Sequence, residues 1–323
     1  MKRFAFLLPL LLLCLFSGCR RVYECKELNI IPTPAFQLQK VGSHTLTTTT
    51  KLTMVNLGQN SSVAKYISRS LRKMHIVPTF SGTALEGGIV LRINDSVNSE
   101  IGQEGYLLEV TPATITISAN TETGLFYGYQ TLLLMLPPDV NHVTYTSIQI
   151  PECTILDYPR FEWRGCELDV TRHFFTIDEV KRMLDVMASY KMNKFVWHLA
   201  DDYGWRLEST SFPELNEIGS WRPDRTSIVW DDIEQPQPGE KASYGGYYSK
   251  SQVEDVVKYA EQLHIEVIPS VSLPNHCSAL LASYPRMACD KGEYFVQCGP
   301  RWNANSAICV GDDSIMARTL RII

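Results

Sequence analysis

Four polar side chains stand at the ends of two short apolar runs and could bind a ligand or take part in catalysis. Arg172 follows the run CELDV, and His198, Asp201 and Asp202 lie at the end of the run KFVWHL. A guanidinium offers several N–H donors in a fixed fork, which suits two neighbouring hydroxyl groups. A carboxylate can in turn fix the orientation of an imidazole. The residue types therefore indicate a ligand-binding or catalytic site.

Two of these assignments have a structural alternative. Asp201 and Asp202 resemble an acid–base pair, yet neighbouring side chains on an extended segment point to opposite sides. We therefore expect the two carboxylates to serve different partners, with Asp202 holding loops together by accepting backbone donors. For Arg172 the alternative to ligand binding is a salt bridge with Asp169.

The pattern of elements places these side chains at one edge of a parallel sheet. Thr176 with Glu179 forms the reciprocal capping pattern of a helix start, and apolar residues follow at helical spacing. The order is thus strand, helix, strand, and a further helix from Ser249 leads to a third strand at 266–270. Chemistry in such sheets and barrels collects at the carboxyl ends of the strands.

The region before this pattern predicts a smaller domain. Residues 29–150 mix helical and strand patterns and contain no catalytic constellation, and a proline-marked boundary follows at 151–159. The fold class is therefore α/β, an N-terminal α+β accessory domain followed by a second domain at 159–323.

Residues 1–18 predict a signal peptide, with Lys2 and Arg3 before a short apolar run. The segment ending at Cys19 resembles a bacterial lipobox, so Cys19 is the expected lipidation site and 19–28 a tether; ordinary secretion is the alternative. We expect an exported, membrane-anchored lipoprotein facing the periplasm or cell surface. The net charge of −5 and the lack of a basic block argue against nucleic acid as a partner.

The cysteines predict no metal site, because no pair has the C-x-x-C spacing. Four of them cluster late in an exported chain, where one or two disulfides or free buried thiols are equally expected: Cys277, Cys289, Cys298 and Cys309.

Long motifs in the second domain resemble the family 20 glycoside hydrolases, the β-N-acetylhexosaminidases. They are RG-x-x-LDV-x-RHF, W-H-L-x-DD-x-GW, FPELNEIGSWRP and VIPSVSLPNHCSALLASYP, and GYLLEVTPATITISANTETGLFYGYQTLLLMLP resembles the accessory domain of the family. The resemblance implies a (β/α)8 barrel and release of terminal β-linked N-acetylhexosamine from glycans without a cofactor. The mechanism is substrate-assisted and retaining, because the acetamido group of the substrate attacks the anomeric carbon.

The resemblance also implies residue roles. Arg172 binds hydroxyls of the terminal sugar, and His198, Asp202 and Trp205 are further expected substrate-binding side chains. Asp201 is expected to orient His276, which in the family contacts the acid/base glutamate.

The sequence departs from the family at two places. Ser270 and Ser272 replace two acidic residues, and Asn275 replaces a glycine before His276. No Asp-Glu pair follows Asp313, so the barrel is expected to be truncated before its acid/base pair and hydrolysis to be impaired. The alternatives are a decayed gene fragment or a non-catalytic, glycan-binding surface lipoprotein whose sugar platform would be formed by Trp205, Trp221 and Trp230.

Overall fold

The computed structural model describes residues 21–81, 88–290, 292–300 and 306–322. The chain divides into two compact units, residues 1–162 with 189–191 and residues 163–188 with 192–323. The expected signal peptide and its Cys19 lie outside the described residues. Within the described ranges, no helix has both the length and the apolar character needed to cross a bilayer.

The first unit is built on one mixed sheet of eight strands in the order β1-β8-β6-β7-β5-β3-β4, with β2 pairing on β8. Residues 22–24, predicted as tether, form β1 and pair with β8, and β8 also runs through most of the predicted boundary at 151–159. The strands are β1 (Val22–Glu24), β2 (Phe36–Thr47), β3 (Lys51–Val55), β4 (Thr79–Ser81), β5 (Gly88–Ile93), β6 (Tyr106–Val110), β7 (Thr114–Ala119) and β8 (Ser147–Asp157).

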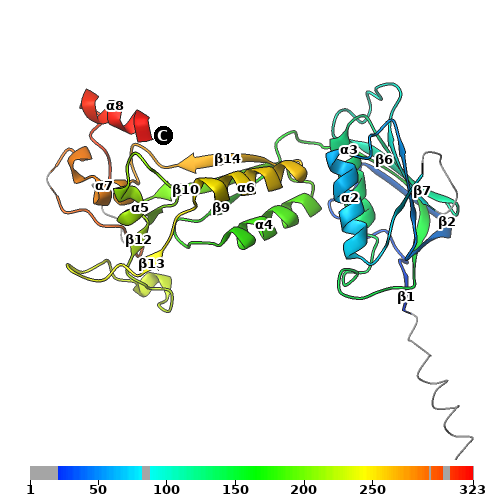
Figure 1. Ribbon diagram of the computed structural model, residues 1–323, viewed down its shortest axis with the longest axis horizontal. Coiled ribbons are helices and arrows are strands. Elements are labelled where there is room, and N and C mark those ends of the chain that lie inside the picture. Colours follow the sequence, from blue (N-terminus) through cyan, green and yellow to red (C-terminus); the bar gives the residue numbers. More distant parts are fainter. Residues whose placement is uncertain (1–20, 82–87, 291, 301–305, 323) are drawn as a thin grey trace, which may run out of the picture. The chain divides into compact units, whose positions relative to one another are not determined.

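Two helices, α2 (Ser62–Lys73) and α3 (Glu122–Leu133), lie on the same face of this sheet (Figure 1). The Ser61 side chain caps α2 by accepting from the Ala64 amide, and Thr121 caps α3 in the same way. Gly128 lets α3 approach the sheet closely, since a Cβ there would come within 2.5 Å of Ile117. The unit thus has its own core between helices and sheet.

The second unit begins with the predicted parallel strands and their crossover helices. Strands β9 (Gly165–Asp169) and β14 (Glu266–Val271) pair in parallel on either side of β10 (Lys194–Asp201). The crossover helices are α4 (Ile177–Ser189) and α6 (Lys250–Gln262), and both start as the sequence predicts: Thr176 and Glu179 exchange hydrogen bonds, and Ser249 forms a capping box with Gln252. The predicted α/β class with parallel strands is confirmed.

The loops at the carboxyl ends of these strands are long but have a core of their own. Buried Phe212, Leu215, Leu280 and Val296 belong to one apolar cluster, which keeps the loops ordered. The short elements are β11 (Gly204–Trp205), α5 (Glu214–Glu217), β12 (Trp221–Arg222), η1 (Trp230–Asp232), β13 (Tyr244–Gly245), α7 (Ser278–Ser283), η2 (Pro285–Met287) and α8 (Asp313–Ile322).

Of the four late cysteines, Cys289 and Cys309 form a disulfide, whereas Cys277 and Cys298 are buried free thiols. Both expected outcomes therefore occur in the same region, one as a bridge and one as buried thiols.

Candidate active site

Arg172 lies in the turn after β9, where it faces two carboxylates. It forms an ion pair with Asp169, the contact expected as the structural alternative, and its Nη1 lies 3.2 Å from Oδ2 of Asp201. Its side chain remains 48 % exposed, so the fork is anchored and still reachable from solvent. Burial alone would lower the pKa of Arg172, but the bonds to Asp169 and Asp201 outweigh it and raise that pKa. The guanidinium is therefore a fixed positive charge.

Asp169 shapes the turn that carries Arg172. One carboxylate oxygen accepts from the Thr171 amide at 2.9 Å and the Thr171 hydroxyl at 2.6 Å, while the other accepts from the Arg172 guanidinium. Burial would raise the pKa of Asp169, but these hydrogen bonds outweigh it and lower that pKa. The carboxylate thus stays ionised and holds Arg172 in place.

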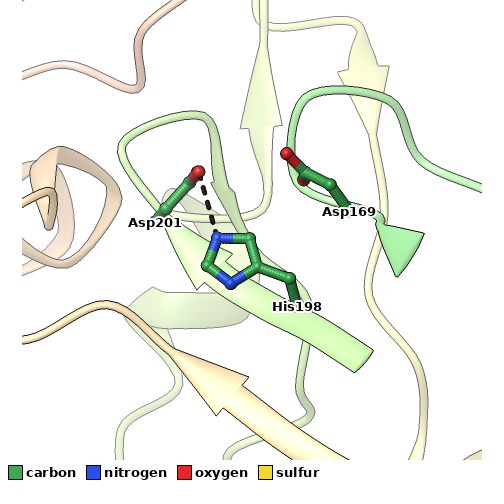
Figure 2. A group of neighbouring side chains, drawn as sticks. All are labelled: Asp169, His198 and Asp201. Atoms are coloured by element: carbon green, nitrogen blue, oxygen red, sulfur yellow. Dashed lines mark hydrogen bonds and ion pairs between the residues drawn. The ribbon is translucent and has the colours of Figure 1, made fainter. Parts of the chain in front are cut away.

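His198 and Asp201 form a buried pair on β10 (Figure 2). Nε2 of His198 lies 3.3 Å from Oδ2 of Asp201, and Nδ1 lies 3.0 Å from the Ser270 hydroxyl on β14. The hydrogen bond to Asp201 raises the pKa of His198, against the opposing effect of burial. Ser270, which replaces an expected acidic residue, thus contacts the second ring nitrogen of His198.

The expected contact between Asp201 and His276 is wrong, because His276 contacts the neighbouring Asp202. It is Asp202 whose Oδ2 lies 2.9 Å from Nδ1 of His276, whereas Asp201 contacts His198, Arg172 and the Tyr203 amide. The other Asp202 oxygen accepts from the amide of Ser278 at 2.9 Å and from its hydroxyl at 2.7 Å. Adjacent carboxylates therefore serve different partners, as expected, and Asp202 does hold a loop together, but it also holds the imidazole.

Trp205 does not face a ligand site. Its side chain is only 4 % exposed, its Nε1 donates to the Leu207 carbonyl, and it belongs to the apolar cluster of the loops. The expected substrate-binding role of Trp205 is therefore wrong: strand β11 folds back antiparallel on β10 and turns the indole inward. Trp230 is the more exposed of the proposed platform tryptophans, at 39 %.

Asp169, His198 and Asp201 bring three possible metal ligands together, with ligand atoms within 4.8 Å of one another (Figure 2). Arg172 contacts both carboxylates of this group. Because the guanidinium already supplies the positive charge that an ion would bring, we assign the cluster to the positioning of Arg172 rather than to metal binding.

Arg206 organises the loops around the site and was not predicted from the sequence. It is fully buried, and its guanidinium donates to five backbone carbonyls at 2.7–3.2 Å, those of Val170, Thr171, Tyr203, Ser220 and Gly246. Burial lowers its pKa to about 10, so it stays charged at neutral pH. Its place between Trp205 and Leu207, directly after the motif DD-x-GW, was the available signal, since an arginine between two large apolar residues needs acceptors if it is buried with them.

A cavity of about 330 Å³ opens beside Arg172. Its lining combines cationic and apolar side chains: Arg172, His173, Arg222, Arg225, Thr226, Ile228, Trp230, Ile233, Tyr244 and Cys298. The Tyr244 hydroxyl lies 2.8 Å from Nδ1 of His173 and accepts from the Phe174 amide, which ties the insertion loop to the turn after β9.

Comparison with known proteins agrees with this geometry. Residues 161–322 match the model of the glycosyl hydrolase family 20 catalytic domain, and residues 27–158 match domain 2 of the same family. The chain belongs to glycosyl hydrolase family 20. The expected accessory domain and partial catalytic domain are thereby confirmed.

Individual relatives support the same family. The chain is 32 % identical over 302 residues to a beta-hexosaminidase of Porphyromonas gingivalis, covering 90 % of this chain and 36 % of the relative. A mutant Streptomyces plicatus beta-hexosaminidase solved with the product GlcNAc is 34 % identical, with a TM-score of 0.75 over 90 % of this chain and 54 % of that one. The enzyme from Streptomyces coelicolor is similar at 33 % identity, a TM-score of 0.75 and coverage of 90 % and 55 %. The chain thus spans about a third to a half of the length of these relatives.

Proposed function

We propose that the loops at the carboxyl ends of β9, β10 and β14 bind the terminal β-linked N-acetylhexosamine of a glycan for the family's hydrolase reaction. The observation that carries this is Arg172, whose guanidinium is fixed by two carboxylates while about half of its side chain stays open to solvent. A preoriented fork loses little freedom when it donates to two vicinal hydroxyls. The product GlcNAc bound to the Streptomyces plicatus relative supports the same sugar class.

The roles of the remaining residues follow from their contacts. Asp169 and Asp201 hold Arg172, and His198 contacts the same Asp201 oxygen, Oδ2, as Arg172 does. In the substrate-assisted retaining mechanism the acetamido oxygen attacks the anomeric carbon while an acid protonates the leaving oxygen. We propose that Asp202 fixes His276 so that this imidazole can orient the acid, since the contact of Nδ1 with the Asp202 carboxylate sets the orientation of the ring.

We further propose that residues 1–323 alone bind this sugar but hydrolyse it poorly. No Asp-Glu pair follows Asp313, and general acid catalysis contributes about 10²–10⁴-fold to rates of this kind. A purely glycan-binding role is the second candidate, and the open position of Arg172 is equally compatible with it.

The test combines binding and turnover on the purified chain. Binding of N-acetylglucosamine, followed by isothermal calorimetry, should be saturable and should fall at least about tenfold in Arg172→Gln, because a charge-assisted hydrogen-bond pair is lost. Arg286→Gln removes an exposed arginine outside the site and serves as the matched control. Equal affinity in Arg172→Gln would refute the binding proposal. Release of 4-nitrophenol from the β-N-acetylglucosaminide at ordinary enzyme rates, abolished by Asp201→Ala, would refute the expected impairment.

A further inference from the structure

The cavity beside Arg172 is lined by positively charged side chains. Among the residues that the structure describes, three arginines line it and no aspartate or glutamate does. The lining also contains apolar side chains, those of Ile228, Trp230 and the buried Ile233. Its volume of about 330 Å³ lies at the lower end of the range of small-ligand pockets, roughly 300–1,000 Å³.

Two of the arginines have carboxylate partners that stand outside the cavity lining. Arg172 is paired with Asp169 and Asp201, and Arg225 lies 2.6 Å from Glu240. The third differs. Arg222 is only 7 % exposed, and its guanidinium donates hydrogen bonds to the backbone carbonyls of Gln297 and Arg172. In the described part of the chain no carboxylate lies within ion-pair distance of Arg222.

The buried surroundings of Arg222 destabilise the positive charge of its guanidinium. Its guanidinium lies 5.3 Å from the ring centre of Tyr244 and 5.8 Å from that of Tyr203, which compensates the charge only in part. Burial accordingly lowers the pKa of Arg222. A buried cation without a counter-ion is destabilising, and a bound anion would offset the cost.

We propose that this cavity binds an anionic substituent of the substrate glycan, a sulfate or phosphate ester or a carboxylate, next to the sugar held by Arg172. This rests on the proposed function, because Arg172 is both the sugar ligand and one wall of the cavity. Arg222 and Arg225 supply the planar donors that suit tetrahedral or carboxylate oxygens, and Trp230 supplies an apolar face for the ring that carries the anion.

A second, larger cavity in the same unit supports the choice by contrast. It measures about 710 Å³, and its described lining contains three glutamates, Glu217, Glu240 and Glu293, beside Arg222. Such a lining disfavours an anion. Glu240 lines this second cavity while its carboxylate pairs with Arg225, so the ion pair lies between the two cavities.

The test measures binding of four probes to the full chain by calorimetry: N-acetylglucosamine, its 6-sulfate, its 6-phosphate and glucuronic acid. We expect at least one anionic sugar to bind about 10- to 100-fold more tightly than N-acetylglucosamine, with an affinity that falls as salt rises. Comparison of the three anions identifies the preferred group. Inorganic sulfate alone should bind more weakly than the sugar sulfate.

Four variants locate the effect. Arg222→Gln and Arg225→Gln should bring the anionic sugar down to the affinity of the neutral one, and Arg286→Gln should change neither. Glu240→Gln removes the carboxylate that competes for Arg225 and should strengthen anion binding, which a loss of folding could not do.

The outcomes separate the two proposals. Equal binding of neutral and anionic sugars in the native chain overturns the anion site and leaves the proposed function intact. Anion binding without any binding of N-acetylglucosamine overturns the proposed function instead, and absence of binding by every probe overturns both. Weaker anion binding in Glu240→Gln, with the fold retained, also overturns the anion site.

Discussion

Replacing Arg206 by methionine should destabilise the second unit strongly. Methionine keeps a similar length but removes all five donors from carbonyls that lie in a buried loop junction. A buried acceptor left without a donor costs about 1–3 kcal/mol. The losses are not additive, and removing the charge also removes its own burial cost, so we expect a net loss of ~3–5 kcal/mol in the free energy of unfolding.

The measurement is urea unfolding of the full chain followed by tryptophan emission. All six tryptophans lie at or after residue 163, so this signal reports the second unit alone. With a urea slope of about 2 kcal/mol/M, the midpoint should fall by ~1.5–2.5 M. Arg206→Lys keeps the charge but not the fork and should fall between the two, whereas Arg286→Met, on the surface, should match the native chain. A midpoint for Arg206→Met within about 0.5 M of the native value would refute the reasoning.

Three further predictions concern other parts of the chain. Because the pKa of His198 is raised on folding, its stabilising effect is complete below its unfolded pKa of about 6.5 and is lost as pH rises through the folded value; the pH dependence of the tryptophan-monitored midpoint should show this loss, and His198→Gln should not. Asp202→Asn should weaken the contacts to His276 and Ser278 by about 1–3 kcal/mol and speed hydrogen exchange at the Ser278 amide; unchanged exchange would contradict the loop-holding role. Cys19→Ser should move the expressed protein from the membrane to the soluble fraction, and an unchanged distribution would argue against lipidation.

Local signals in the sequence were sufficient for the strands and helices that carry the candidate site. The helix start at Thr176 was predictable because its cap is formed by Glu179, three residues away, and nothing distant decides it. Three apolar runs predicted the positions of β9, β10 and β14, and these strands pair in parallel. The position of the site at the strand ends followed from topology.

The partners of the two adjacent aspartates could not be predicted in this way. The pairing of β10 with β14 shifts in register between His198 and Ala200. In a regular strand, side chains three positions apart point to opposite faces, but such an irregularity changes the alternation. His198 therefore contacts Asp201, and His276 contacts Asp202. The burial of Trp205 had a similar cause, because the fold-back of β11 depends on the packing of a whole loop.

The contacts of Arg206 give the site an uneven response to acid. Its five acceptors are peptide carbonyls, which do not titrate, so acid leaves this junction unchanged. The link between Asp169 and Arg172 depends instead on a carboxylate that takes up a proton once the pH falls through its lowered pKa. Acidification should consequently release the guanidinium that we propose binds the sugar, while the junction held by Arg206 keeps its contacts, so that ligand affinity is lost before this junction opens.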